Sequence, residues 1–121
     1  MKPAILLVDD ETFTLAALER ILAEIAPEYE LLSVVNGAGA LALIAQRPIA
    51  LVITDQRMPT MDGLTLMTAI KASAPQCPMI LMTGYPSPEI EQRARAAGAQ
   101  YLTKPFRVDQ LAAMVRSAPR A

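Results

Sequence analysis

The chain has 121 residues, of which 53% are hydrophobic and 19% charged, with a formal net charge of −1, one cysteine and no histidine. This length fits one domain, and the composition is too apolar for a disordered chain. Without histidine the chain can form no Ser-His-Asp triad and no His-containing zinc site, and one cysteine excludes an internal disulfide. We therefore expect a single domain over residues 1–121, with a core over about 4–117, in the reducing cytoplasm.

Five short apolar runs have the length of β-strands. Three of them are apolar almost throughout, which is typical of strands that are covered on both faces of a parallel sheet. The runs are 4–8 (AILLV), 31–35 (LLSVV), 49–53 (IALVI), 79–82 (MILM) and a weaker one at 99–103 (AQYLT).

Between and after these runs lie segments whose apolar residues have helical spacing. Their stripes are Leu15, Leu18, Leu22 and Ile25; Ala38, Leu41, Ala42 and Ala45; Leu66 and Ile70; Ile90, Ala94 and Ala97; and Val108, Leu111 and Val115. Pro27 and Pro48 end the first two helices, and Gly98 is a natural C-cap for the fourth. Five β-α units in strict alternation predict an α/β fold, a doubly wound five-stranded parallel sheet with right-handed crossovers.

Polar residues follow four of the predicted strands. In a doubly wound sheet, ligands bind outside the carboxyl ends of the strands, so these residues converge on one edge. They are Asp9, Asp10 and Glu11 after the first strand, Asp55 after the third, Thr83 and Gly84 after the fourth, and Lys104 and Pro105 after the fifth. A single aspartate at a strand end is more often a helix cap or turn residue, but four strand ends with complementary chemistry favour a binding site.

The chemistry of this set favours phosphoryl transfer. Clustered carboxylates repel one another unless a cation lies among them, and oxygen ligands without His or Cys favour Mg²⁺, with Mn²⁺ as an alternative. Lys104 supplies a positive charge for an anion such as phosphate, while the hydroxyl of Thr83 and the backbone amide of Gly84 add donors. With no Ser-His pair available, a carboxylate is the expected nucleophile and an aspartyl phosphate the expected product.

Four segments resemble the receiver domain of two-component response regulators, in order and at the family's spacing, over residues 4–117. They are LVDDE at 7–11, DQRMPTMDG at 55–63, MTG at 82–84 and YLTKPF at 101–106. The resemblance implies a flavodoxin-like strand order of 2-1-3-4-5, a cis peptide before Pro105, and a signalling switch that catalyses only its own phosphorylation and dephosphorylation.

The resemblance also implies a role for each site residue. Asp55 would be the phosphoacceptor, and the phosphoryl group would be bound by Lys104, Thr83 and the backbone amides of Gly84 and Arg57. Mg²⁺ would be held by Asp10, Asp55 and the backbone carbonyl of Arg57, with Asp9 acting mainly through water. Thr83 and Tyr101 would form the switch, with Tyr101 rotating inward, and Arg57 and Tyr85 would tune the lifetime of the phosphoryl group.

The implied partners are proteins. A sensor histidine kinase or phosphotransfer protein would donate the phosphoryl group, and the face formed by helix 4, strand 5 and helix 5 would control an output domain or downstream protein. Arg93, Arg95 and Arg107 are candidates for contact on this face, although a solvated surface explains them equally well. We expect no direct nucleic-acid binding by this domain, and no apolar run approaches the roughly 20 residues that a membrane span needs.

Alternative functions remain open. A pseudo-receiver that only binds proteins would usually lack the acceptor, a metal ligand or the lysine, and none is missing here. A Mg²⁺-dependent phosphohydrolase of the haloacid dehalogenase type needs a second Asp two residues after the nucleophile, where this chain has Arg57. A flavodoxin-like cofactor binder would have a Ser/Thr/Gly-rich loop after the first strand instead of acids.

Local features complete the predictions. Gly39 should weaken the second helix by about 0.5–1 kcal/mol, two prolines place the start of the fourth helix at Ser87 or later, and Asp62 is a plausible cap of the third. Met1-Lys2-Pro3 leads into an apolar run without a cleavage site, so we expect no signal peptide. The sequence ends at 118–121 (APRA) without an output domain, which fits both a stand-alone receiver and the front of a longer regulator.

Overall fold

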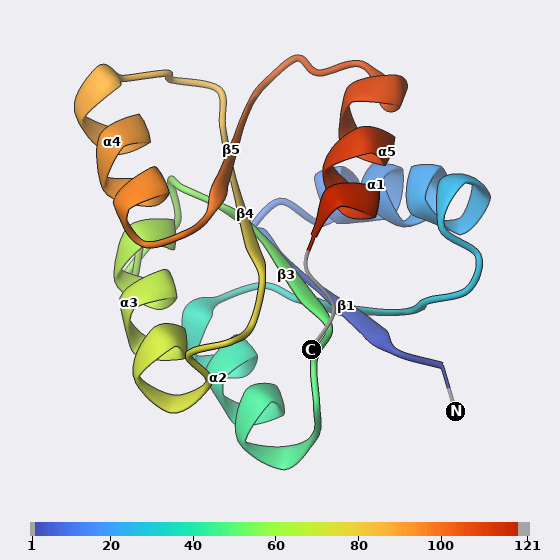
Figure 1. Ribbon diagram of the computed structural model, residues 1–121, viewed down its shortest axis with the longest axis horizontal. Helices are drawn as coiled ribbons and strands as arrows, with labels where there is room; N and C mark the ends of the chain where they lie inside the picture. The colour runs from blue at the N-terminus through green and yellow to red at the C-terminus, as the bar shows by residue number, and fades with distance from the viewer. Residues whose placement is uncertain (1, 119–121) are drawn as a thin grey trace.

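The computed structural model describes residues 2–118, in which strands and helices alternate strictly. The strands are β1 (Ala4–Val8), β2 (Glu30–Val34), β3 (Leu51–Asp55), β4 (Met79–Thr83) and β5 (Gln100–Thr103). The helices are α1 (Thr12–Ile25), α2 (Gly37–Gln46), α3 (Gly63–Ser73), α4 (Pro88–Ala96) and α5 (Val108–Ser117) (Figure 1). The predicted α/β alternation is confirmed.

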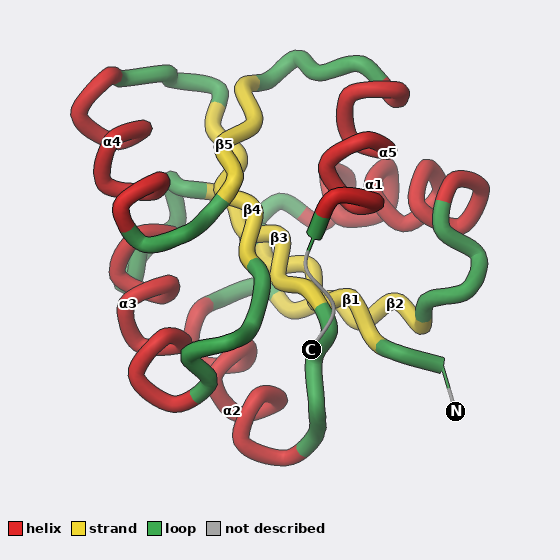
Figure 2. The backbone as a smooth tube through the Cα atoms, in the orientation of Figure 1, coloured by secondary structure: helices red, strands yellow, loops and turns green. Residues whose placement is uncertain are grey.

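The strands form one parallel sheet in the order β2-β1-β3-β4-β5, as predicted (Figure 2). The chain passes from β1 outward to β2 and then returns past β1 to β3. The order therefore reverses between β1 and β3, and this reversal is where sheets of this type leave a crevice for a ligand.

Four of the five strands differ in their bounds from the sequence prediction. β2 begins and ends one residue earlier than predicted, and β3 begins and ends two residues later. β4 ends one residue later than predicted, and β5 begins one residue later. As a result Asp55 is the last residue of β3 and does not follow the strand, because it still pairs with Met82 of β4. Ile49 and Ala50, which the apolar run had assigned to the strand, lie before it.

The helices cover both faces of the sheet, α1 and α5 on one side and α2, α3 and α4 on the other (Figure 1). Successive residues of β1 point to opposite faces, as in any strand. Leu6 and Val8 therefore belong to the apolar cluster on the side of α2, α3 and α4, whereas Ile5 and Leu7 belong to the cluster on the side of α1 and α5. Burial on both faces explains why these strands are apolar without alternation.

Several helix ends follow their predicted signals. Asp62 caps α3 by accepting a hydrogen bond from the Thr65 amide at 2.8 Å, and Ser87 caps α4 with Pro88 in its first turn. Gly98, just beyond α4, has a φ of +83°, which only glycine adopts without strain. None of the helices in residues 2–118 is both long enough and apolar enough to cross a membrane.

Candidate functional site

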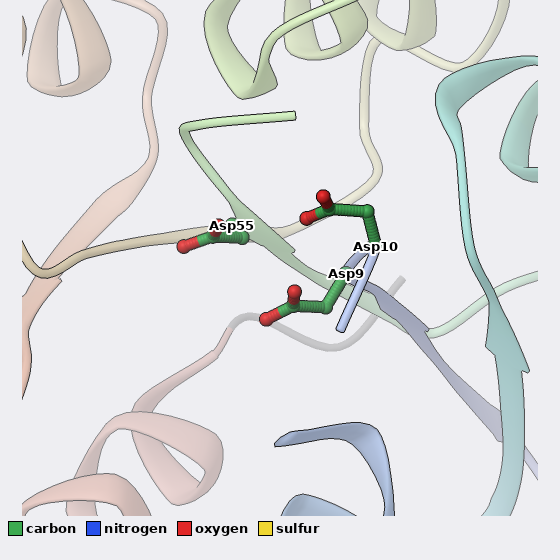
Figure 3. Close-up of side chains that lie close together, drawn as sticks. All are labelled: Asp9, Asp10 and Asp55. Atoms are coloured by element: carbon green, nitrogen blue, oxygen red, sulfur yellow. The ribbon is translucent and has the colours of Figure 1, made fainter. Parts of the chain in front are cut away.

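Three carboxylates meet at the carboxyl edge of the sheet, where the strand order reverses. Asp9 and Asp10 follow β1, and Asp55 ends the neighbouring β3. One carboxylate oxygen from each residue lies within 4.8 Å of the others. Figure 3 shows all three side chains extending into the same space beyond the strand ends. The sequence-predicted acidic cluster is therefore assembled in the fold.

The three carboxylates differ in their exposure to solvent. Asp9 is fully buried, Asp55 is 6% exposed, and Asp10 lies on the surface. The Asp9 Oδ1 atom accepts a hydrogen bond from the Glu11 amide at 3.0 Å, whereas Oδ2 is buried without a hydrogen-bond partner. Burial raises the pKa of the Asp9 carboxyl; the Glu11 amide and Lys104 oppose this rise, and the charges of Asp55 and Asp10 add to it.

Lys104 brings one positive charge to this cluster from the end of β5. Its Nζ atom donates a hydrogen bond to Asp55 Oδ1 at 3.0 Å and lies 3.6 Å from Asp9 Oδ2. Burial lowers the pKa of Lys104, but the hydrogen bond and charge of Asp55 and the charge of Asp9 outweigh it, so the net shift is upward. The Lys104–Pro105 peptide bond is cis, as the resemblance implied.

The donor set fits a hard divalent cation. All the potential side-chain ligands are carboxylate oxygens, which Mg²⁺ prefers. Lys104 contacts two of the three clustered acids, Asp55 and Asp9, and the buried Asp9 Oδ2 atom lacks a hydrogen-bond partner. A buried charged oxygen without such a partner is costly, and a cation or its bound water would satisfy it. The residues present therefore match a magnesium site.

Thr83 is the last residue of β4, and Tyr101 lies in the neighbouring β5. Thr83 is 2% exposed, and its hydroxyl accepts a hydrogen bond from the Tyr85 amide at 3.0 Å. The ring of Tyr101 is buried in this structure, and its hydroxyl accepts a hydrogen bond from the Ser87 amide at 3.2 Å. The hydroxyl of Tyr101 is thus tied to the N-cap of α4, two residues beyond the amide that Thr83 holds.

Arg57 and Tyr85 form a stacked pair beyond the strand ends. The guanidinium carbon of Arg57 lies 4.0 Å from the centre of the Tyr85 ring, within the range of a cation–π interaction. The two residues come from the β3–α3 and β4–α4 loops, so the pair bridges these loops. Gly84, between Thr83 and Tyr85, has open space where a side chain would begin, which leaves its backbone accessible.

Two residues that support the site were missed or undervalued by the sequence analysis. A Cβ atom at Gly63 would lie 2.5 Å from the Asp55 carbonyl oxygen, so only glycine lets α3 begin this close to the acid. Gln56 is buried and hydrogen-bonds to the first turn of α3. A polar residue directly after a buried strand was the available signal for Gln56.

Comparison with known proteins agrees with this geometry. Residues 5–116 match the model of the response regulator receiver domain. The chain is 35% identical over 119 residues to the hydrogenase transcriptional regulatory protein HoxA of Cupriavidus necator, covering 97% of this chain and 24% of that protein. It is 36% identical over 117 residues to the transcriptional regulatory protein PrrA of Mycobacterium tuberculosis, covering 95% of this chain and 49% of that protein.

The fold has equally clear relatives among solved structures. The signal receiver domain of an HD domain-containing protein from Pseudomonas fluorescens superposes with a TM-score of 0.89 at 34% identity, covering 98% of this chain and 94% of that one. The chain belongs to the response regulator receiver domain family, whose members are signalling switches. It spans about a quarter to a half of the length of the two curated relatives named above.

Proposed function

We propose that this receiver domain takes a phosphoryl group onto Asp55 in a Mg²⁺-dependent reaction and passes the signal on through a change of surface. The observation that carries the proposal is the contact of Lys104 with Asp55 inside a cluster of three carboxylates. This arrangement offers a nucleophile, a cation site and a fixed positive charge within one small space. Positioning and charge neutralisation are what phosphoryl transfer chiefly requires.

The phosphoryl donor would be a phosphohistidine on a sensor histidine kinase or phosphotransfer protein. An Asp55 carboxylate oxygen forms the new O–P bond while the P–N bond of the donor breaks, and the electron pair returns to the imidazole nitrogen. Lys104 Nζ, 3.0 Å from the acceptor carboxylate, is placed to pair with the transferred oxygens. The Thr83 hydroxyl and the backbone amides of Gly84 and Arg57 would donate the remaining hydrogen bonds.

Asp10, Asp55 and the backbone carbonyl of Arg57 would hold Mg²⁺, with Asp9 acting mainly through water. The cation, for which Mn²⁺ could substitute, would neutralise the charge on the transferred group. The chain itself holds the carboxylates together against their mutual repulsion. The Asp9 Oδ2 atom, which has no hydrogen-bond partner, supports this assignment, because a metal-bound water would supply the hydrogen bond that it lacks.

Thr83 and Tyr101 would transmit the signal. A phosphoryl group at Asp55 would draw the Thr83 hydroxyl toward it. The hydroxyl can donate a hydrogen bond to that group and at the same time accept one from a backbone amide. The inward Tyr101, with its hydroxyl on the Ser87 amide, then links β5 to the start of α4. Phosphorylation would favour this packing, so that the α4–β5–α5 face controls an output domain or partner protein.

The stacked pair of Arg57 and Tyr85 would tune how long the phosphoryl group survives. Its two side chains bridge loops on either side of the site, where they can limit access by attacking water. The catalytic scope of the domain would be limited to its own phosphorylation and dephosphorylation. We place this activity in the cytoplasm, with residues 1–121 as one domain; residues 1 and 119–121 lie outside the described part of the chain.

The test is intact-mass measurement after incubation with acetyl phosphate and Mg²⁺, with Asp55→Asn as the control. We expect the wild type to gain one phosphoryl group, and we expect no gain in the variant or without Mg²⁺. A gain at another residue would overturn the assignment of Asp55. A folded protein that binds no Mg²⁺ and gains no phosphoryl group from either acetyl phosphate or a phosphohistidine donor would favour the binding-only alternative.

A further inference from the structure

Gln56, the residue after the proposed phosphoacceptor, is fixed through both its backbone and its side chain. Its amide donates to the Met82 carbonyl of β4 at 2.9 Å, and its own carbonyl accepts from the Gly63 amide at 3.0 Å. Its side-chain Oε1 atom accepts from the Leu64 amide at 2.9 Å, and its Nε2 atom donates to Asp62 Oδ2 at 3.3 Å. The residue is only 8% exposed, so these bonds face little competition from water.

The chemistry of the partners fixes the orientation of this amide. A backbone N–H can only donate, and an ionised carboxylate can only accept, so Oε1 must face Leu64 and Nε2 must face Asp62. Asp62 in turn caps α3 through its other oxygen, which accepts from the Thr65 amide. Gln56 and Asp62 therefore form one hydrogen-bonded unit with the first turn of α3.

This unit closes the loop that carries Arg57. The loop leaves β3 at Gln56 and returns to α3 at Asp62, and the Gln56–Asp62 contact joins its two ends. Inside it, Thr60 has a φ of +71°, a strained value for a β-branched residue, and the Met61 amide donates to the Pro59 carbonyl at 2.7 Å. A loop with an internal strained turn keeps one shape only where its ends are held.

We propose that Gln56 is a positioning residue for phosphoryl transfer, holding the Arg57 backbone carbonyl and amide in place through its side-chain bonds to Leu64 and Asp62. The inference rests on the proposed function, in which that carbonyl binds Mg²⁺ and that amide binds the phosphoryl group. Gln56 touches neither ligand itself. Its effect comes from the fixed shape of the loop, as with other groups that orient a metal ligand.

The experiment compares two glutamines that each bond to the helix after their strand, Gln56 at the carboxyl end of β3 and Gln100 at the amino end of β5, away from the site. Gln56 joins β3 to α3, and Gln100 joins β5 to α5, donating to the Met114 carbonyl at 2.8 Å and accepting from the Ser117 hydroxyl at 3.2 Å. Gln56→Leu and Gln100→Leu each remove two side-chain hydrogen bonds at similar volume. Each variant is titrated with Mg²⁺ by calorimetry, and its rate of phosphorylation by acetyl phosphate is measured at saturating Mg²⁺.

A rescue variant separates loop geometry from simple loss of packing. The double substitution Gln56→Glu with Asp62→Asn reverses the direction of the bond between the two side chains and leaves the net charge unchanged. The new carboxylate can still accept from the Leu64 amide, and the new amide oxygen can still cap α3. Gln56→Glu alone sets two carboxylates against each other and serves as the unrescued partner.

We expect Gln56→Leu to weaken Mg²⁺ binding by about tenfold and to slow phosphorylation at saturating Mg²⁺. Gln100→Leu should leave both unchanged, and the double variant should regain most of the affinity lost in Gln56→Glu. A wild-type Mg²⁺ affinity and phosphorylation rate in Gln56→Leu, or equal losses of both in Gln100→Leu, would overturn this inference but not the proposed function. A wild type that binds no Mg²⁺ and accepts no phosphoryl group would instead overturn the proposed function, and the inference with it.

Discussion

The middle of β1 and the residue just after its carboxyl end are equally buried, but the groups that surround them are opposite in character. Leu6 is fully buried in the apolar cluster on the α2–α3–α4 side of the sheet. Asp9, three residues later, is also fully buried, but it faces Asp55 and Lys104 and has one carboxylate oxygen without a hydrogen-bond partner. Burial stabilises the fold at the first position and opposes ionisation at the second.

This difference shows that, within a few residues of one strand, some positions stabilise the fold and others serve function. The strand middles keep the carboxyl edge rigid, so that like charges can be held together without spreading apart. The carboxyl edge has three features that lower stability: clustered acids, a buried oxygen without a hydrogen-bond partner and a strained turn at Thr60. Substitutions in the two regions should therefore change stability in opposite directions.

The largest effect is expected at the strand middle. Leu6→Ala removes a fully buried side chain and leaves a cavity between β1 and the α2–α3–α4 side, which should lower the free energy of unfolding by about 3 kcal/mol. Urea denaturation monitored by circular dichroism would measure this loss. Mg²⁺ affinity below the unfolding transition should stay at the wild-type value, and a parallel loss of affinity would show that the two regions are not separate.

The opposite sign is expected at the carboxyl edge. Asp9→Asn keeps an acceptor for the Glu11 amide and removes a buried charge, so the metal-free protein should become more stable by on the order of 1 kcal/mol. Adding Mg²⁺ should reverse the ranking, because only the form that binds the cation tightly gains stability from it. Thermal unfolding with and without Mg²⁺ measures both. A variant less stable than the metal-free wild type would contradict this account.

The same residue predicts a pH dependence. The folded state raises the pKa of Asp9 above its ordinary value of 3.8, so between the two values the folded protein binds more protons than the unfolded chain. The metal-free wild type should therefore lose stability relative to Asp9→Asn as pH rises through this window, and the difference should stop changing below it. Urea denaturation of both proteins across acidic pH checks the sign. A difference that shrinks with rising pH would be contrary to the raised pKa.

The sequence was sufficient for the architecture because local signals agree with the fold. Apolar runs, helical stripes and the prolines and glycine between them identify all ten elements. The exact end of β3 was missed, since an apolar run cannot show that the ladder extends through a polar Asp55 paired with Met82. The order of the strands came from the resemblance to a family, because alternation alone does not specify which strands are neighbours.

The candidate site was predictable as a set of residues but not as a geometry. The prediction placed the acids and Lys104 together because the carboxyl ends of parallel strands lie at the same edge of a sheet. The unequal burial of Asp9 and Asp10, adjacent in sequence, depends on how the chain leaves β1, which no local pattern records. The stacking of Arg57 on Tyr85 joins loops from different strands, and the bonds of Gln56 depend on where α3 begins.

A smaller gain in stability is expected from the β3–α3 loop. Thr60→Gly removes a β-branched side chain from a residue with a φ of +71° and so relieves backbone strain. Glycine also gives the unfolded chain more conformational freedom, which lowers stability, but we expect this loss to be smaller than the strain relieved. The free energy of unfolding should rise by about 0.5–1 kcal/mol. Thr65→Gly, at an exposed position in α3, is the matched control and should lower it by a similar amount. A destabilised Thr60→Gly variant would show that the turn is not strained.

The smallest expected effect is at the stacked pair of Arg57 and Tyr85, and it changes the lifetime of the phosphoryl group and not the stability of the fold. Tyr85 is 65% exposed, so Tyr85→Ala removes little packing but ends the cation–π contact that holds Arg57 across the site. A contact of about 0.5–1 kcal/mol corresponds to a two- to fivefold shorter phosphoryl lifetime, if its loss opens the site to water. Decay of the phosphorylated mass after removal of acetyl phosphate measures it. Arg57→Ala should shorten the lifetime equally and the double variant no further, because either substitution removes the same contact; additive effects would mean that the two side chains act independently.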